Sequence, residues 1–183
     1  MARDCDWSAA WDWPRTVISE TDNSLVWRAS GPRGQHVVIK KGRVPYGVTA
    51  GSKRLFMTFE ETAAKRCRGQ PHLVELLDAK GDGLERLLMF EWLRGKSVEN
   101  FAADRPLPLR GAVQAFRHMV QAIGALHAAN VLHGDIHPRN IMIRRQPHRR
   151  FQATVFDLGL ARILDSYYPF MTVGGSPGYK APE

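Results

Sequence analysis

Short apolar runs separated by polar turns fill the first half of the chain, and this alternation is typical of a β-rich segment. The predicted strands cover residues 17–29, 36–41, 73–79 and 86–93, with turns at 30–34 and 80–83. Between the second and third of these strands, residues 55–68 are rich in Ala, Glu, Lys and Arg, which predicts a helix. Gly69 and Pro71 are expected to end it.

The second half opens with a long helical pattern. Residues 109–129 place five apolar side chains at helical spacing, which predicts an amphipathic or fully buried helix. These side chains are Val113, Phe116, Val120, Ile123 and Leu126. Two short β segments follow at 141–143 and 153–156, and the basic loop 144–150 between them is predicted to be longer than a tight turn.

The change from strands to helices predicts an α+β fold with two lobes. Residues 1–93 form the strand-rich first lobe, residues 94–183 form the helix-led second lobe, and the hinge lies around Arg94–Lys96. Hydrophobic residues make up 44% of the chain and charged residues 24%, which indicates a globular protein. A tryptophan-rich start is expected to pack against the first sheet; it contains Trp7, Trp11 and Trp13.

Charge and cysteine content bear on the partners and the cellular compartment of the protein. The net charge of +8 suits an anionic partner such as a nucleotide, a nucleic acid or an acidic membrane surface, and it equally suits a basic surface with no special partner. Cys5 and Cys67 do not form a disulfide framework. The chain has no signal-like start and no apolar run of membrane-spanning length, so we expect a cytoplasmic protein without a membrane partner.

The candidate chemistry is concentrated in a few polar residues. The segment HGDIHPRN, residues 133–140, directly follows the long predicted helix, and a short β segment further on leads into Asp157. Upstream, a predicted strand ends at Lys40 and the next helix offers Glu61. Transfer of a phosphoryl group from ATP needs oxygen ligands for magnesium, a cation held against the phosphates, and a carboxylate that orients the incoming hydroxyl. This set of residues supplies each of them.

The order and spacing of these residues resemble the protein kinase family, from Val17 to Glu183. The motifs VVIK, HGDIHPRN and DLG are similar to that family's VAIK, HRDxxxxN and DFG. LMFEWLRG (88–95) is similar to its hinge, and GGSPGYKAPE (174–183) is similar to its GTPxYxAPE segment. The resemblance implies a two-lobed fold, binding of ATP and Mg²⁺, and phosphotransfer.

Roles follow from the resemblance position by position. Lys40 would contact the α- and β-phosphates and Glu61 would hold it, with Lys41 and Glu60 as the neighbouring alternatives. Asp135 would orient the substrate hydroxyl, and the magnesium ligands would be Asn140 and Asp157. His133 would be a packed, hydrogen-bonded structural residue rather than a catalytic one.

The resemblance also implies a set of nucleotide contacts. Around the adenine and ribose these are Val26, Val38, Phe90, the backbone of Glu91 and Leu93, and Ser97. Because side chains alternate along a strand, Val38 is expected on the same face as Lys40. The family's glycine-rich loop is absent: the aligned stretch 18–29 has hydroxyl side chains that could donate to phosphate oxygens instead, namely Ser19, Thr21 and Ser24.

Three further departures affect function. Gly134 replaces the family's arginine, which reads a phosphate on the activation loop, so phosphorylation at Ser166 or Thr172 is expected not to be required. His137 stands where Ser/Thr kinases carry lysine, a feature similar to aminoglycoside phosphotransferases, and is a candidate bridge to the γ-phosphate. Leu158 replaces phenylalanine, an exchange that keeps an apolar side chain.

The segment at 174–183 favours a protein Ser/Thr kinase, because it resembles the part of protein kinases that seats the residue after the phosphoacceptor. The alternatives are a small-molecule kinase of the aminoglycoside type, a nucleotide-binding pseudokinase or scaffold, and a helical or basic interaction module. The partners expected are ATP and a protein substrate. Nucleic acid is disfavoured, because loop 144–150 lacks interleaved aromatic residues; the oligomeric state is not specified by the sequence.

The chain stops at Glu183, at the match to the family's APE motif. The resemblance implies further helices beyond this point, so the chain is expected to be a truncated or fragmentary catalytic domain with an incomplete helical second lobe. Phe116, Val120 and Ile123 are then expected to form an exposed apolar patch.

Overall fold

The computed structural model describes residues 7–22, 24–43, 50–82, 85–104, 106–148, 150–166, 175–176 and 178–179, with only the backbone described at 50–56. Contacts divide the chain into two compact units. The first contains residues 1–61 and 75–92, and the second contains 62–74 and 93–183. The predicted site residue Thr172 and most of the segment 174–183 lie outside the described residues.

These units differ from the predicted lobes at Leu93, which belongs to the second unit, and in one longer segment. Residues 62–74 belong to the second unit, whereas the predicted boundary placed them in the first lobe. The physical reason is a bridge between Leu73 and Val155, supported by a 3.0 Å hydrogen bond from Val74 N–H to the Val155 carbonyl oxygen. The end of the helical stretch therefore leads into backbone pairing with the second unit.

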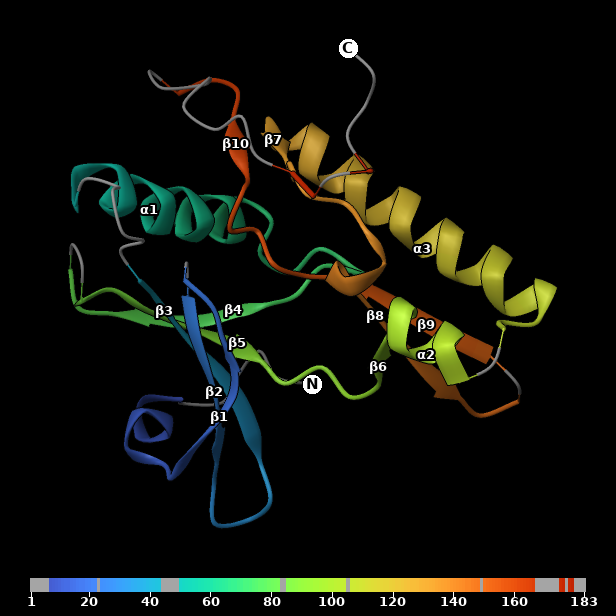
Figure 1. Cartoon of the computed structure of the whole chain (residues 1–183), viewed down its shortest axis with the longest axis horizontal. Coiled ribbons are helices and arrows are strands. Elements are labelled where there is room, and N and C mark those ends of the chain that lie inside the picture. Colours follow the sequence, from blue (N-terminus) through green and yellow to red (C-terminus); the bar gives the residue numbers. More distant parts are fainter. Residues whose placement is uncertain are drawn as a thin grey trace. The chain divides into compact units, whose positions relative to one another are not determined.

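The first unit is built on a five-stranded antiparallel sheet in the order β1-β2-β3-β5-β4 (Figure 1). Its elements are η1 (Ser8–Asp12), β1 (Arg15–Glu20), β2 (Ser24–Ser30), β3 (His36–Gly42), β4 (Leu76–Lys80), β5 (Leu87–Glu91) and most of α1 (Ala50–Arg66), whose residues from 62 onward belong to the second unit. The helix α1 begins earlier than predicted. Gly51 and Ser52 have weak helix propensity, so the sequence did not indicate that the helix includes them. A turn between Thr21 and Ser24 also divides the segment 17–29 into two strands.

Alternation along β3 separates a core face from the face that carries Lys40. Val37 and Ile39 are buried with Ala10 and Trp11 of the first segment, and Trp7, Trp13 and Trp27 pack against the same cluster. Trp11 Nε1 also donates a 2.7 Å hydrogen bond to Asp78 Oδ2. The prediction that the three early tryptophans pack against the first sheet is confirmed.

The second unit combines two small sheets with one long helix. Its elements are β6 (Lys96–Ser97), α2 (Val98–Asp104), α3 (Leu109–Ala128), β7 (Val131–Leu132), η3 (Pro138–Asn140), β8 (Ile141–Gln146), β9 (Arg150–Val155) and β10 (Arg162–Ile163). The sheets have the orders β6-β8-β9 and β10-β7. Figure 1 shows α3 lying beside β9.

The basic segment 144–150 is mostly strand, not the long loop that the sequence predicts. Arg144 pairs with Gln152, Arg145 with Phe151 and Gln146 with Arg150, so the hairpin continues through most of the segment. Arg145 also lies 5.6 Å from the centre of the Phe151 ring. The aliphatic stem of a long arginine side chain can pack along a strand while its guanidinium extends away from it.

Helix α3 packs through its small residues. Gly111, Ala115, Ala122 and Leu126 are buried, while Phe116 is 64% exposed and Val120 52% exposed. The predicted apolar stripe is therefore largely the outer face of the helix, and the expected exposure of these two side chains is confirmed. Among the residues that the structure describes, no helix has the length and apolar character needed to cross a membrane.

Two histidines cover the outer edge of β9 at a single residue. His118 Nδ1 accepts a 3.2 Å hydrogen bond from Ala153 N–H, and His72 Nδ1 donates at 3.1 Å to the Ala153 carbonyl oxygen. The two rings are stacked with their centres 3.8 Å apart. Burial, together with His72 and Arg117, lowers the pKa of His118. A neutral His118 therefore accepts the backbone N–H of Ala153 at this edge.

This pair predicts a loss of stability in mild acid. Because the pKa of His118 is lowered on folding, the unfolded chain binds more protons below its ordinary pKa of about 6.5, so stability falls as the pH drops through that value. Urea unfolding followed by circular dichroism should show a lower midpoint at about pH 5.5 than at about pH 7.5. The variant His118→Gln keeps an acceptor for Ala153 N–H and should show a smaller difference. An equal difference in both proteins would contradict this assignment.

Candidate active site

The loop that connects β7 to η3 is organised around a buried histidine. His133 Nδ1 accepts a 3.3 Å hydrogen bond from Asp135 N–H, so Nε2 carries the ring proton and donates at 3.1 Å to the Phe156 carbonyl oxygen. Burial lowers the pKa of His133, which keeps the ring neutral. The prediction that His133 is a packed, hydrogen-bonded residue is confirmed.

Gly134 follows at a position that excludes any side chain. Its φ of 81° lies in the left-handed region, and a Cβ built here would collide with the carbonyl oxygen of Leu160. Glycine avoids both penalties because it has no Cβ. The family's arginine therefore does not fit this backbone, so its absence is a property of the loop geometry as well as of the sequence.

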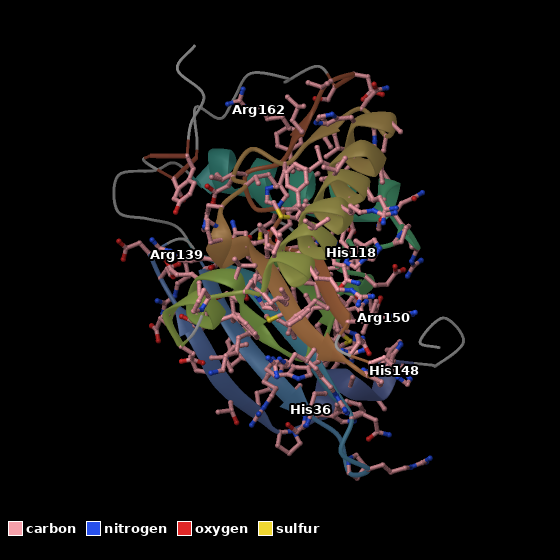
Figure 2. The ribbon with its side chains drawn as sticks, turned by 90° about the vertical axis from the view of Figure 1, so that its right-hand side faces the viewer. His36, His118, Arg139, His148, Arg150 and Arg162 are labelled. Carbon is pink, nitrogen blue, oxygen red and sulfur yellow. The ribbon has the colours of Figure 1, made fainter. Side chains whose placement is uncertain are left out.

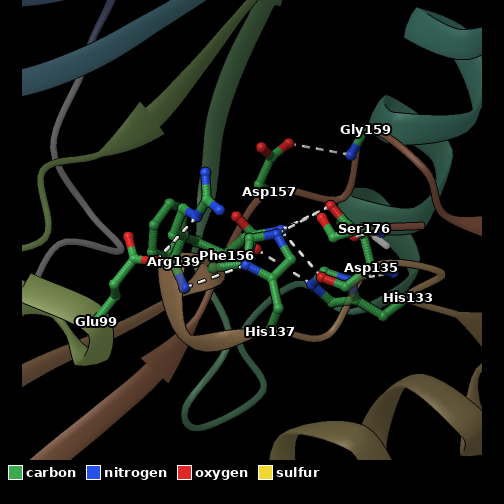
Figure 3. Close-up of polar contacts among 10 residues, drawn as sticks. Glu99, His133, Asp135, His137, Arg139, Phe156, Asp157, Gly159 and Ser176 are labelled. Carbon is green, nitrogen blue, oxygen red and sulfur yellow. Dashed lines mark hydrogen bonds and ion pairs between the residues drawn. The ribbon is translucent and has the colours of Figure 1, made fainter. Parts of the chain in front are cut away.

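The carboxylate of Asp135 is the centre of the loop (Figure 3). Its Oδ2 accepts hydrogen bonds from Asn140 Nδ2 at 3.1 Å and from His137 Nε2 at 3.2 Å. Its Oδ1 accepts one from Ser176 N–H at 2.8 Å. Burial alone would raise the pKa of Asp135, but the hydrogen bonds from Ser176 and the imidazole of His137 bring it below its ordinary value. Asp135 is thus an ionised, well-oriented acceptor.

His137 is engaged within the loop through both ring nitrogens. Nδ1 accepts a 3.2 Å hydrogen bond from Arg139 N–H, so in the neutral ring the proton is on Nε2 and is donated to Asp135. The side chain is also buried. In this structure His137 positions the carboxylate of Asp135, while its predicted bridge to a γ-phosphate stays a prediction.

Asn140 and Asp157 are linked to the same loop. Asn140 is buried, and its Nδ2 donates to the Asp135 backbone oxygen at 3.0 Å as well as to the carboxylate. Phe156 N–H donates to the Asn140 carbonyl oxygen at 3.0 Å, and Asp157 is the next residue. Asp157 has a φ of 64° and its Oδ1 accepts a 3.3 Å hydrogen bond from Gly159 N–H. Left-handed φ at a residue other than glycine is uncommon and concentrates at functional sites.

The donor chemistry of these two residues fits magnesium. An amide oxygen and a carboxylate are the hard oxygen ligands that Mg²⁺ accepts, and the ion takes its remaining ligands from water and phosphates. Because the amide nitrogen of Asn140 is turned toward Asp135, its oxygen is the atom left to bind a cation. Among the described residues, no group of three or more His, Cys, Asp or Glu could hold a metal on its own, so any such site would depend on the ligands that a nucleotide brings.

In the first unit, the predicted cation has a different partner from the one expected. Lys40 Nζ lies 2.8 Å from Glu60 Oε1, and both side chains are largely buried, with 13% and 3% exposed. Glu61 instead pairs with Arg86 at 2.7 Å. Consecutive helical residues point about 100° apart, so only one of two adjacent glutamates can face β3. Here that residue is Glu60, the neighbouring alternative, and not Glu61.

Strand register brings several predicted nucleotide contacts onto the face of Lys40. Val26 of β2 is the cross-strand partner of Lys40, and Phe90 of β5 is the partner of Val38. Since Val38 and Lys40 are two residues apart, all four share the face opposite the tryptophan core. The expected side-by-side placement of Val38 and Lys40 is confirmed.

The remaining predicted contacts have local partners. Glu91 N–H donates to the Glu75 carbonyl oxygen at 3.0 Å, so this donor is already engaged. Burial raises the pKa of the Glu91 carboxyl. Ser97 Oγ accepts from Asn100 N–H at 3.2 Å and caps α2. Leu93 begins the second stretch of the second unit, directly after β5 and Trp92.

The hydroxyl residues of the β1–β2 turn contact one another. Thr21 Oγ1 accepts from Ser24 N–H at 3.1 Å, and Thr21 N–H donates to the Ser24 carbonyl oxygen at 2.9 Å. Ser19 lies on β1 where the register with β2 shifts. The hydroxyl groups thus help to form a tight turn, and donation to a phosphate stays a prediction.

Two contacts of the loop were not anticipated from the sequence. The backbone of Ser176 reaches Asp135, although the two residues are far apart in the chain and the sequence indicated only that the segment 174–183 resembles a family motif. Arg139 pairs with Glu99 at 3.2 Å, and no motif indicates that pairing. Both contacts depend on tertiary structure that no local pattern contains.

Comparison with known proteins adds an independent line of support. Residues 23–183 match the protein kinase domain family. The chain is 30% identical over 177 residues to the serine/threonine-protein kinase PkaB of Streptomyces coelicolor, covering 91% of this chain and 41% of that protein. It is 28% identical to CBL-interacting protein kinase 22 of Oryza sativa subsp. japonica, covering 91% and 41%.

A third relative is the liver/testis isoform of the phosphorylase b kinase gamma catalytic chain of Homo sapiens, 24% identical over 97% of this chain and 46% of that protein. The chain therefore spans less than half the length of these relatives. A family match over most of the chain, together with the loop built around Asp135, leads to one conclusion: this chain belongs to the protein kinase family.

Proposed function

We propose that this chain carries catalytic machinery of a protein Ser/Thr kinase, which transfers the γ-phosphoryl group of ATP to a serine or threonine hydroxyl of a protein. The observation that carries the proposal is the carboxylate of Asp135, ionised and held by three hydrogen bonds from Asn140, His137 and Ser176. Phosphoryl transfer relies on positioning and electrostatics more than on covalent chemistry, and such a carboxylate is suited to hold a hydroxyl in place.

In the transfer, the substrate hydroxyl oxygen bonds to the γ-phosphorus while the bond from that phosphorus to the bridging oxygen of ADP breaks. Asp135 accepts the hydrogen bond of the attacking hydroxyl and takes its proton as the new bond forms. Because the pKa of Asp135 is below its ordinary value, the carboxylate is a weak base. Its main contribution is therefore orientation, and proton transfer comes late.

The nucleotide and its magnesium ion would be held by the residues that the family resemblance implies. Asn140 and Asp157 would bind Mg²⁺, which when bound offsets the negative charge of the phosphates. Lys40 would contact the α- and β-phosphates, with Glu60 as its anchor. The remaining proposed contacts are those of the adenine, ribose and phosphate groups, namely Val26, Val38, Phe90, Glu91, Leu93, Ser97, Ser19, Thr21 and Ser24.

A protein substrate is favoured over a small molecule by the contact of Ser176. Ser176 lies in the segment similar to the GTPxYxAPE of protein kinases, and its N–H donates to the hydroxyl-orienting carboxylate at 2.8 Å. A segment tied to Asp135 in this way is well placed to contact the chain on either side of a phosphoacceptor. This contact supports the assignment of a protein kinase in preference to an aminoglycoside-type kinase.

The central test is the removal of the Asp135 charge. In Asp135→Asn, the amide cannot take the proton and its NH₂ group faces existing donors, so phosphotransfer to a Ser/Thr peptide mixture should fall at least about 100-fold. Transfer of radiolabelled phosphate from ATP measures this. Asp165→Asn makes the same change at an exposed carboxylate paired with Arg66 and should retain activity. Equal activity in both variants, or phosphorylation of aminoglycosides in place of peptides, would contradict the proposal.

The choice between Glu60 and Glu61 predicts different effects on nucleotide binding. Glu60→Gln weakens the hold on Lys40 and should reduce the affinity for ATP with magnesium about 10-fold, the effect of one charge-assisted hydrogen bond. Glu61→Gln removes the charge that pairs with Arg86 and leaves the carboxylate beside Lys40 in place, so it should leave the affinity nearly unchanged. Titration with a fluorescent ATP analogue measures both, with thermal melting to confirm folding. A larger loss in Glu61→Gln would restore the original expectation.

Gly134 gives a prediction for the loop itself. Gly134→Ala adds a Cβ against Leu160 at a left-handed φ and should destabilise the chain by more than about 1–3 kcal/mol. Residue 134, the position of the family's phosphate-reading arginine, is glycine here, which supports the expectation that activity does not require phosphorylation at Ser166 or Thr172.

Variants at two other glycines separate the effect of backbone strain from that of the contact with Leu160. Gly34→Ala has a φ of 75° but open space around its Cβ, so it carries only the backbone strain. Gly124→Ala lies in α3 with open space and should stabilise by about 0.5–1 kcal/mol. Urea unfolding measures all three, and a Gly134→Ala variant as stable as Gly34→Ala would show that the contact with Leu160 is harmless.

A further inference from the structure

The stretch of chain around Asp135 has an unusual charge distribution. Asp135 is the only acidic residue between Asp104 and Asp157, while the same stretch contains eight arginines. Within the part of it that the structure describes, Arg144, Arg145 and Arg150 belong to the β8–β9 hairpin, and Arg139 belongs to η3. The carboxylate that would orient a substrate hydroxyl therefore lies in a segment that is otherwise cationic.

Arg139 is the cation closest to Asp135 in the chain, and it is available. Its side chain is 68% exposed, and its only acidic partner among the described residues is Glu99, which contacts Nε at 3.2 Å. This contact leaves the two terminal nitrogens of the guanidinium for another acceptor. An exposed ion pair of this kind contributes little to stability, so packing does not explain why arginine is present here.

The position of Arg139 is fixed relative to the hydroxyl-orienting carboxylate. Arg139 N–H donates to His137 Nδ1, and His137 Nε2 donates to Asp135 Oδ2 (Figure 3). Two hydrogen bonds through one buried ring therefore connect the backbone of Arg139 to Asp135. A substrate whose hydroxyl meets Asp135 would present its neighbouring residues to a cation at a constant offset.

We propose that Arg139 is a specificity-determining residue that selects protein substrates with an aspartate or glutamate next to the phosphoacceptor. This inference rests on the proposed function and names its substrate class. The guanidinium presents its donors in a planar fork that matches a carboxylate, and such charge-assisted hydrogen bonds are stronger than neutral ones. Glu99 competes for the same guanidinium and thereby limits the preference.

Four variants and one peptide set test the proposal. The peptides share one serine acceptor and differ only in flanking residues, which are Asp, Asn or Lys. The wild-type chain should phosphorylate the Asp peptide with a kcat/KM about 10-fold above that of the Lys peptide, mainly through KM. Arg139→Glu should reverse this order, Arg139→Lys should keep part of it, and Glu99→Gln should increase it.

Arg150→Glu is the matched control. It makes the same change of charge on β9, at the end of the hairpin away from the β8 residue Ile141 that follows Asn140, and Figure 2 shows Arg150 well apart from Arg139. It should leave the peptide preference unchanged. If Arg150→Glu altered the preference as much as Arg139→Glu, the effect would come from overall charge and the proposal would be overturned.

The remaining outcomes separate this inference from the proposed function. Equal kcat/KM for all flanking residues in an active enzyme would overturn the inference alone, as would an Arg139→Glu effect confined to the KM for ATP. If no peptide were phosphorylated, the proposed function would fail. Binding of the same peptides with alanine in place of the acceptor serine, followed by fluorescence anisotropy, would then still decide whether the acidic preference exists and depends on Arg139.

Discussion

The conformation of the loop that connects β7 to η3 depends on one carboxylate that must be ionised and yet partly shielded from water. Asp135 satisfies this constraint by accepting hydrogen bonds from the amide of Asn140, the ring of His137 and the backbone of Ser176. Two of these donors are held in turn by other hydrogen bonds: the Asn140 backbone accepts from Phe156, and His137 accepts from Arg139. The loop is therefore a closed set of mutual restraints in which moving one residue leaves a buried polar group unsatisfied.

A similar constraint applies to the charged pair of Lys40 and Glu60 in the first unit. Lys40 sits on a sheet whose other face is the tryptophan-lined core, so a cation on this strand is partly removed from solvent. Glu60 compensates for that cost at 2.8 Å, because a buried charge without a partner is strongly destabilising. Pairing does not make the lysine stabilising. It offsets the cost of burying a lysine at a position where a negatively charged ligand could contact it.

The sequence was informative wherever a residue's role is set by its neighbours in the chain. The alternation along β3 placed Val38 and Lys40 on one face, the tryptophans were recognised as core, and the motif order indicated the family. The sequence did not predict contacts that depend on the direction in which a helical side chain points. Glu60 and Glu61 are chemically identical, and only the phase of α1 against the sheet distinguishes them. In α3, periodicity detected the larger apolar side chains, but of these Phe116 and Val120 are exposed, and Leu126 shares the buried face with Gly111 and two alanines.

The close approach of Gly134 to Leu160 limits what a single substitution can add to this loop. The backbone at residue 134 is in a left-handed conformation and lies against the neighbouring turn. An arginine substituted here would meet that turn before it could meet any phosphate. A phosphate-reading side chain at this position would therefore require the turn to open as well, which puts it out of reach of one mutation.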